Sequence, residues 1–278
     1  MVFEFEGYQM GYVKFGQGPH PLLAFHGFGQ HAEVFYNLEA ALGKHFTVYS
    51  FDLFHHGKSL FPQGVPKNTP ITPEFHQAWI ETFLNENTIQ RFSMIGYSLG
   101  GRLVFQTLQQ MPQRVQSLIL LAPDGIKKSF WYHYATQNPR GKILFQRTVE
   151  RPELFFRLVK YLRMMGFVSK KMEKFTHSQF GDREKREKVL HVWNAYSRIV
   201  PRVGITKQVL RQYHIPVALF TGKYDPVLNS EIGSILHKGM EDLVTWKVLE
   251  TGHDLLKPVY CEDIYPVLAE RIFPLLDT

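Results

Sequence analysis

The chain has 278 residues, of which 44% are hydrophobic, 14% aromatic and 21% charged, a composition that excludes a disordered tail, a collagen-like fibre and a small disulfide scaffold. Its one cysteine, Cys261, excludes an internal disulfide, and neither a run of about 18 apolar residues nor the basic-then-apolar order of a signal peptide is present, so we expect a cytoplasmic protein. The net charge is +7, but there is no zinc-finger spacing and no glycine-aromatic RNA-binding motif, so we expect no nucleic-acid partner.

The first half of the chain predicts strands and helices in regular alternation. Two stretches of alternating hydrophobicity flank Gly7 and predict an antiparallel strand pair, and short apolar runs then predict buried strands between helices. In chain order, the expected elements are strands 2–6 and 9–15, strand 21–26, helix 32–42, strand 46–51, helix 73–87, strand 91–95, helix 99–111 and strand 116–121.

The alternation stops there and later returns with strand 215–221, helix 230–238, strand 244–249 and a last helix from about Glu262. This order predicts an α/β fold with a mostly parallel, doubly wound sheet of eight strands covered by helices. We assign residues 1–123 and 206–278 to this core. Residues 124–205 are expected to form a helical domain inserted after the sixth strand.

The motif Gly96-Tyr97-Ser98-Leu99-Gly100 lies between an expected strand and an expected helix. A serine at such a sharp turn needs small neighbours, and its hydroxyl projects above the sheet at the helix N-terminus, where free N–H groups face the reaction. The context is typical of a nucleophilic serine. The alternative is a glycine-rich turn that only caps a helix.

A nucleophilic serine needs a base, which a third group orients. Asp225 directly follows one of the late strands, and His253 follows the last strand. Because both residues come at the carboxyl ends of strands, in the order acid and then histidine, we expect a catalytic triad of Ser98, His253 and Asp225. Asp124 also follows a strand and is the alternative acid, and the alternative for His253 is a surface-loop histidine.

The sequence His26-Gly27-Phe28-Gly29 ends the third expected strand. Acyl transfer develops a negative charge on oxygen, and two backbone N–H groups must already be aimed at it. We expect the amides of Phe28 and Leu99 to form this oxyanion hole. His26 is expected to hydrogen-bond loop backbone and to have no catalytic role.

Together these motifs resemble the α/β-hydrolase fold family over nearly the whole chain. HGFG, GYSLGG, the Asp225 turn and the Gly252-His253 turn fall in register with the expected strands. The resemblance implies that residues 124–205 form the lid or cap domain.

One loop departs from the family pattern. Phe54 and His55 stand where the family usually has the Pro and Gly of D-x-P-G-H-G-x-S, which leaves the shape of this loop open. The aspartate-nucleophile relatives, haloalkane dehalogenases and epoxide hydrolases, are disfavoured because Ser98 occupies the position of their nucleophile.

The expected cap is strongly basic. Residues 124–205 hold 18 Lys and Arg against 7 Asp and Glu, a net of +11, whereas the rest of the chain holds 14 against 18, a net of −4. Within residues 153–168, one helical face carries Leu154, Leu158, Leu162 and Met165. We favour a helix packed on the core as the explanation of this face. The alternatives are an apolar acyl pocket and a lid that rests on an anionic lipid surface, and we do not expect membrane contact.

We expect a serine hydrolase that cleaves a carboxylic ester, or a related acyl bond, of a small to medium apolar or anionic molecule through an acyl-enzyme. No metal or organic cofactor is implied, because the triad supplies nucleophile, base and electrophilic stabilisation. His55 and His56 are adjacent, which is unfavourable for chelating one ion, and we expect no metal site there. The oligomeric state is left open.

The candidate substrate contacts are Tyr97, Arg102 and Trp131. One alternative function is a carbon–carbon-bond hydrolase or pyruvate-eliminating lyase, because GYSLGGR resembles the elbow of the menaquinone-pathway synthase and Arg102 suits an acidic substrate. Against that, we favour Arg102 as a helix-surface residue. The other alternative is a weakly catalytic binding or receptor protein.

Overall fold

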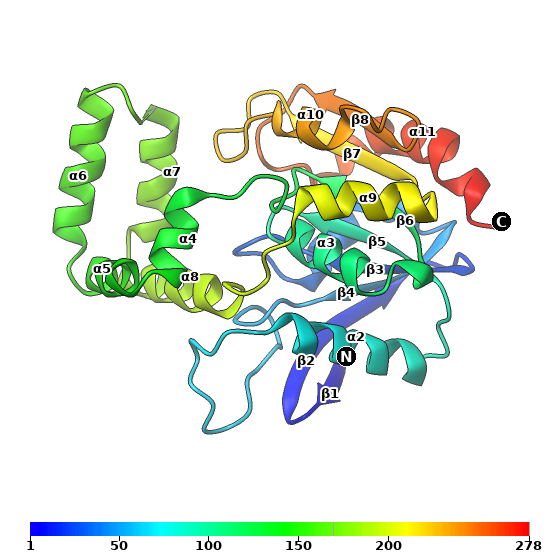
Figure 1. The fold of residues 1–278 in the computed structure, drawn as a ribbon, viewed down its shortest axis with the longest axis horizontal. Helices are drawn as coiled ribbons and strands as arrows, with labels where there is room; N and C mark the ends of the chain where they lie inside the picture. The colour runs from blue at the N-terminus through cyan, green and yellow to red at the C-terminus, as the bar shows by residue number, and fades with distance from the viewer. Residues whose placement is uncertain (169, 278) are drawn as a thin grey trace. The chain divides into compact units, whose positions relative to one another are not determined.

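The computed structural model describes residues 1–168 and 170–277 (Figure 1). The chain divides into two units. The first comprises Met1–Gln63, Thr72–Lys127 and the chain from Ile199 onward, and the second comprises Gly64–Ile71 and Lys128–Arg198. The second unit thus includes a short segment that precedes the insert expected from the sequence, and its role as a cap stays a prediction.

Eight strands form one sheet in the first unit, as the sequence predicts. They are β1 Val2–Phe5, β2 Tyr8–Phe15, β3 His20–Phe25, β4 Phe46–Phe51, β5 Phe92–Tyr97, β6 Val115–Leu121, β7 Val217–Gly222 and β8 Val244–Leu249. Their order in the sheet is β1-β2-β4-β3-β5-β6-β7-β8. β2 pairs antiparallel with β1 and β4, and the other neighbours are parallel. The parallel strands put the loops after β3, β5, β7 and β8 at the same edge of the sheet, which is what brings distant motifs together.

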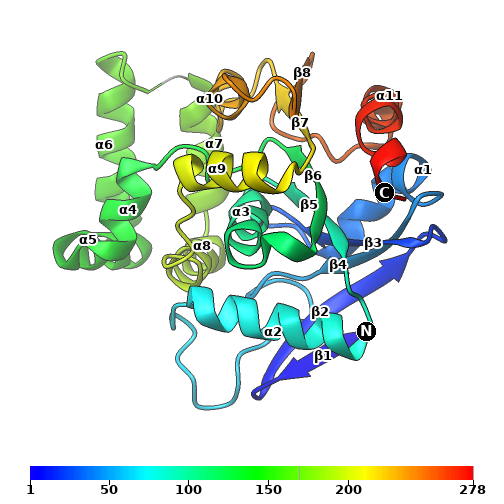
Figure 2. The same cartoon turned by 45° about the vertical axis from the view of Figure 1, so that its right-hand side comes forward.

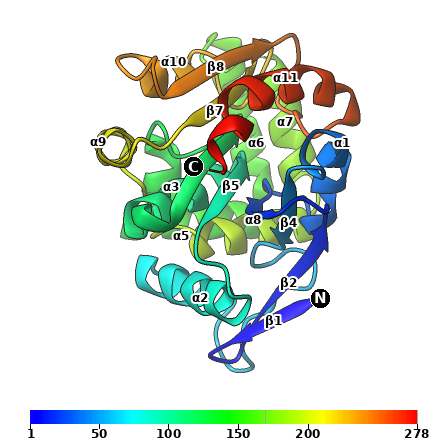
Figure 3. The same ribbon diagram turned by 90° about the vertical axis from the view of Figure 1, so that its right-hand side faces the viewer.

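Helices cover both faces of this sheet. After a 3₁₀ turn over Ala32–Leu38, the helices of the first unit are α1 Glu39–Leu42, α2 Pro73–Glu86, α3 Gly100–Gln110, α9 Val203–Tyr213, α10 Ile232–His237 and α11 Cys261–Arg271. α1 and α11 lie on one face, and α2, α3 and α9 lie on the other (Figure 3). Because both faces are covered, every residue of β5 and β7 is buried, which explains why these strands are mostly apolar and do not alternate with exposed polar residues.

Two helix predictions need correction. The single helix expected over residues 32–42 is a 3₁₀ turn followed by one α-helical turn. Its start is held by a tertiary contact, since the Ala32 amide donates to Oδ1 of Asp52 at 2.7 Å, and hydrophobic spacing does not report such a contact. The sequence also missed α9, which crosses the boundary expected at residue 205 between the insert and the core.

The regular secondary structure described in the second unit is helical. Its helices are α4 Phe130–Gln137, α5 Pro139–Glu150, α6 Pro152–Met164, α7 Lys170–Phe180 and α8 Arg183–Ala195. Ser129, Asn138 and Asp182 each accept a hydrogen bond from the first turn of the helix that follows, which is the preferred capping chemistry. Across the described residues of both units, no helix has the length and apolarity needed to cross a bilayer.

His76 on α2 is a fully buried histidine in the first unit. Its Nε2 lies 2.9 Å from Oγ1 of Thr107 on α3, and burial lowers the pKa of His76 to about 4. The unfolded chain binds a proton at this residue below about pH 6.5, whereas the folded chain remains neutral down to about pH 4. Stability present above pH 6.5 is therefore lost as the pH falls toward 4, by about 3 kcal/mol in total.

Replacing His76 by Leu should flatten this acid dependence. At neutral pH the variant should be less stable than wild type, because Thr107 loses its partner. Between pH 6.5 and 4.5 that difference should shrink by about 2 to 3 kcal/mol, measured by urea denaturation across this range. His31→Leu at an exposed position is the control and should keep the wild-type dependence. A constant stability difference between wild type and His76→Leu would contradict the prediction.

Candidate active site

Ser98 lies at the sharp turn between β5 and α3, with a φ of +50° in the left-handed region that L-residues rarely adopt. Its amide donates to the carbonyl oxygen of Leu121 at 3.0 Å. Its own carbonyl oxygen accepts from the amides of Gly101 at 2.9 Å and Asp124 at 2.8 Å. The end of β6 and the start of α3 therefore hold Ser98 in a strained conformation.

The two glycines of the motif are required by close backbone approach. A Cβ atom at Gly100 would lie 1.9 Å from the carbonyl oxygen of Phe25, and one at Gly96 would lie 2.7 Å from Cγ2 of Val104. The turn thus brings α3 against β3 and β5 more closely than any side chain allows, which confirms the expected need for small neighbours.

Substitution of Gly100 by Ala should destabilise the protein by about 3 kcal/mol or more, because the added methyl group meets a backbone carbonyl that cannot rotate away. The matched control is Gly204→Ala on α9, where a Cβ meets nothing within 4 Å. That change should stabilise the protein by up to about 1 kcal/mol through the higher helix propensity of Ala. Urea denaturation measures both, and equal effects at the two positions would show that the elbow has room for a side chain.

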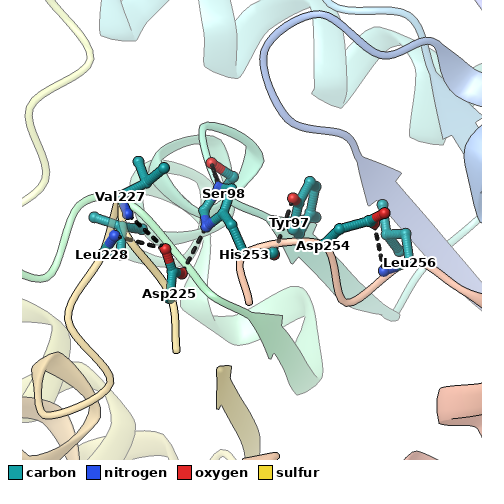
Figure 4. A network of polar contacts seen from close by, with 8 residues as sticks. All are labelled: Tyr97, Ser98, Asp225, Val227, Leu228, His253, Asp254 and Leu256. Carbon is teal, nitrogen blue, oxygen red and sulfur yellow. Dashed lines mark hydrogen bonds and ion pairs between the residues drawn. The ribbon is translucent and has the colours of Figure 1, made fainter. Parts of the chain in front are cut away.

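Three side chains distant in the sequence form a continuous hydrogen-bonded array (Figure 4). Nε2 of His253 lies 2.9 Å from Oγ of Ser98, and Nδ1 of His253 lies 2.6 Å from Oδ2 of Asp225. The other carboxylate oxygen of Asp225 accepts from the amides of Val227 at 2.7 Å and Leu228 at 2.9 Å. Each of the three residues follows the carboxyl end of a parallel strand: β5, β7 or β8.

The array fixes which atoms donate. A carboxylate has only acceptors, so Nδ1–H of His253 donates to Asp225, and Nε2 is left to accept from the Ser98 hydroxyl. The Asp225 side chain is 1% exposed, whereas that of His253 is 19% exposed. Such an arrangement can remove a proton from Ser98 and stabilise the resulting imidazolium.

Tyr97, predicted as a substrate contact, is buried and supports the loop of His253. Its hydroxyl donates to the carbonyl oxygen of His253 at 3.0 Å. Burial raises the pKa of the Tyr97 hydroxyl, and the carboxylates of Asp254 and Asp225 raise it further, so the group stays a donor. A contact between Tyr97 and substrate remains a prediction that this geometry does not favour.

The turn after β3 lies against the elbow. A Cβ atom at Gly27 would lie 3.1 Å from Cβ of Ser98, so this backbone packs directly beside the serine. Among the described residues, no acceptor is bonded to the amides of Phe28 and Leu99. The neighbouring Gly29 amide, in contrast, donates to the side chain of His56. The two amides predicted as an oxyanion hole are therefore available to an incoming oxygen atom.

Two histidines brace this turn. His26 accepts at Nε2 from the Leu53 amide at 3.0 Å, and its Nδ1 lies 2.7 Å from the carbonyl oxygen of Gly27. His56 accepts at Nε2 from the Gly29 amide at 2.9 Å. Because a ring nitrogen that accepts carries no proton, Nε2 is the unprotonated nitrogen of both rings. The expected backbone role of His26 is confirmed, and the bracing role of His56 was missed by the sequence.

The loop that departs from the family pattern keeps a left-handed turn. His55 has a φ of +68°, the conformation that the usual glycine adopts at least cost, and its ring stacks on Phe61 with centroids 5.0 Å apart. Asp52 anchors the loop by accepting from the amides of Ala32 at 2.7 Å and Lys58 at 2.8 Å. The two unusual residues therefore do not abolish the turn.

Arg102 and Asp124 bind each other beside the elbow. Nε of Arg102 lies 2.7 Å from Oδ2 of Asp124, and Oδ1 of Asp124 accepts from the Gly125 amide at 2.7 Å. The alternative that Arg102 is a helix-surface residue is wrong, because the side chain is buried. Asp225, not Asp124, is bonded to His253. A substrate contact by Arg102 remains a prediction, and its ion pair gives that prediction no support.

Trp131, the remaining predicted contact, lies on α4 in the second unit and is exposed, with its ring edge-on to Phe130 at 5.2 Å. Its role stays a prediction. Over residues 1–168 and 170–277, no group of three His, Cys, Asp or Glu side chains is arranged to hold a metal ion. The sequence missed the two amides that hold Asp225, although Asp-Pro at 225–226 is a turn signal that indicates such bonds.

Comparison with known proteins agrees with this fold. The chain is 31% identical to an uncharacterized Mycobacterium tuberculosis protein over 122 residues, and spans only 34% of that relative's length. It is 24% identical to the pimeloyl-[acyl-carrier protein] methyl ester esterase of Chromobacterium violaceum over 258 residues, which cover 86% of this chain and 88% of the relative.

Among solved structures, a thermophilic esterase from Thermogutta terrifontis is similar with a TM-score of 0.63 at 16% identity, covering 95% of this chain and 92% of that one. At this identity the likeness speaks for the fold alone. The family model described as alpha/beta hydrolase fold matches residues 20–257, which is most of the chain. The protein therefore belongs to the alpha/beta hydrolase fold family.

Proposed function

We propose that the protein is a serine hydrolase that cleaves carboxylic esters through an acyl-enzyme. The observation that carries this proposal is the unbroken path from Oγ of Ser98 through His253 to Asp225, with distances of 2.9 and 2.6 Å. The backbone strain at Ser98 and the unbonded amides beside it add support, because a fold rarely keeps such costs without a use.

In the first step, Oγ of Ser98 attacks the ester carbonyl carbon while Nε2 of His253 takes the hydroxyl proton. Asp225 stabilises the imidazolium that forms, and the amides of Phe28 and Leu99 donate to the oxyanion. The tetrahedral intermediate then collapses. The alcohol leaves with the proton that His253 returns, and the acyl group stays on Ser98.

In the second step, water attacks the acyl carbon. His253 removes a proton from the water and then gives it to Oγ of Ser98 as the carboxylic acid is released. The site thus returns to its starting protonation state. No other group is needed to balance the protons.

The substrate class follows from the relatives and from Arg102. The Chromobacterium violaceum relative is named a pimeloyl-[acyl-carrier protein] methyl ester esterase, which supports hydrolysis of a carboxylic ester. The pyruvate-eliminating alternative rested on the resemblance of the GYSLGGR elbow, with Arg102 and the basic charge of residues 124–205 suited to an acidic substrate. Because the guanidinium is bonded to Asp124, we favour the ester.

Labelling with a fluorophosphonate tests the proposal. The probe should add one phosphonyl group to the wild-type protein, on the peptide that carries Ser98, and none to Ser98→Ala. Ser234→Ala, an exposed serine on α10, is the control and should label like wild type. An unlabelled wild-type protein would favour the binding or receptor alternative.

A series of p-nitrophenyl esters of increasing acyl length, set beside an assay for pyruvate release, then identifies the chemistry. We expect hydrolysis that is fastest for short to medium chains and absent in Ser98→Ala. Pyruvate release from an anionic precursor without ester hydrolysis would contradict the proposal.

A further inference from the structure

α6 presents a row of exposed apolar side chains. Leu154, Leu158, Tyr161 and Met165 recur at intervals of four, three and four residues, which places them on one helical face. Their side chains are 54% to 67% exposed. Leu162, which the sequence placed on this face, is half-buried. We call these four exposed residues the apolar face of α6.

The packing of α6 within the second unit is made by a different side of the helix. α6 lies beside α7 (Figures 1 and 2). Phe155 contacts Phe180 with ring centroids 5.1 Å apart, and Phe156 stacks on His177 at 4.3 Å. Val159 is buried. The helix is therefore already anchored in its unit without the apolar face.

Further apolar side chains lie at the end of α6, whose last residue is Met164, and in the turn that follows. Met164 and Phe167 are both more than 70% exposed, on either side of Gly166 with its φ of +80°. Soluble proteins in general rarely expose a contiguous set of large apolar side chains, and such a set marks a site of interaction. Met and Phe at a turn also give a surface that adapts to an irregular partner.

Basic side chains accompany this apolar surface. Arg157 and Lys160 are exposed on α6, and Lys170 and Lys174 are exposed on α7. Arg163 is paired with Glu173 at 2.7 Å, so this pair adds no net charge. Glu153, at the start of α6, is the exposed acid of the helix. The partner that matches this surface is therefore apolar and carries negative charge.

We propose that the apolar face of α6, with Met164 and Phe167, is a docking surface for an anionic phospholipid bilayer. A helix with an apolar face and Lys or Arg beside it lies in the plane of the headgroup region, with its apolar side chains at the acyl boundary. The basic side chains then meet the negative surface potential of the leaflet. This binding does not depend on the chemistry proposed above.

Co-sedimentation with vesicles tests the proposal. Full-length protein should bind vesicles that contain phosphatidylglycerol at low salt, and should bind pure phosphatidylcholine vesicles, or anionic vesicles at high salt, at least about tenfold more weakly. Arg157→Gln with Lys160→Gln should weaken binding by about 25-fold, since each basic residue near the leaflet is worth about fivefold. Equal binding to neutral and anionic vesicles would overturn the proposal.

Leu158→Glu is the decisive variant, and Ile143→Glu is its matched control. Both introduce one negative charge at an exposed apolar position of the second unit, but Ile143 lies on α5. Leu158→Glu should lower vesicle binding at least about tenfold, and Ile143→Glu by less than about threefold. Equal losses in the two variants would show that the apolar face is not the contact.

A dye at the turn reports insertion directly. The single cysteine, Cys261, is buried, so Met164→Cys in a Cys261→Ser background accepts one environment-sensitive dye. Its emission should shift to the blue with anionic vesicles and stay unchanged with neutral ones. If raising the protein concentration in the absence of lipid gave the same blue shift, the apolar face of α6 would be a self-association surface, and the proposal would be overturned. Ser98→Ala should bind vesicles like wild type, which separates failure of this proposal from failure of the proposed hydrolysis.

Discussion

Ser98→Ala is expected to lower kcat for ester hydrolysis by about 10⁶-fold, or about 8 kcal/mol of transition-state stabilisation. The variant lacks the oxygen atom that forms the acyl-enzyme, and His253 loses the proton donor 2.9 Å away. Residual turnover comes from water activated in the same site and from the amides of Phe28 and Leu99.

The same substitution should leave the fold intact. Ser98 is held at its positive φ by backbone hydrogen bonds to Leu121, Gly101 and Asp124, and Ala retains all of them. The thermal midpoint should therefore stay close to that of wild type, measured beside p-nitrophenyl ester turnover. Ser234→Ala should change neither quantity. Substantial turnover by well-folded Ser98→Ala protein would remove this serine from the chemistry.

The fold could be predicted from the sequence because its main determinants are local. A parallel strand buried on both faces is a short continuous apolar run, as Leu22–Phe25 and Val217–Phe220 show. The elements that the sequence missed or described wrongly depend on distant contacts. The turn at Ala32 starts where Asp52 reaches it, and α9 contacts α3 where Nε2 of Gln109 donates to Oγ1 of Thr206 at 2.8 Å.

The candidate site likewise has features that the local sequence indicates and features that depend on contacts between distant residues. The nucleophile and its turn form one contiguous motif between an expected strand and an expected helix, so the local sequence indicated Ser98. The acid was open between Asp225 and Asp124 because both follow strands, and only the placement of Arg102 beside Asp124 and His253 beside Asp225 distinguishes them. Such pairings arise from the arrangement of strands in the sheet, and no local pattern encodes them.

Asp225→Asn is expected to lower kcat by about 10⁴-fold. Oδ1 of Asp225 accepts from the amides of Val227 and Leu228, so the amide oxygen of an asparagine would take that position and its NH₂ group would face Nδ1 of His253. A donor there forces the His253 proton onto Nε2. Nε2 then donates to Ser98 and cannot remove its proton, so the base is lost although all three side chains remain in place.

Asp124→Asn is the matched control, since it makes the same chemical change in the other acid that follows a strand. It weakens the ion pair with Arg102 but keeps the Asp124 amide that donates to the carbonyl oxygen of Ser98 at 2.8 Å. We expect a loss of stability, with kcat reduced by less than about tenfold, because the charge lost is not the one that orients His253. Turnover of p-nitrophenyl esters and urea denaturation measure the two effects. An equal loss of kcat in Asp124→Asn and Asp225→Asn would contradict the prediction, because only Asp225 is bonded to His253.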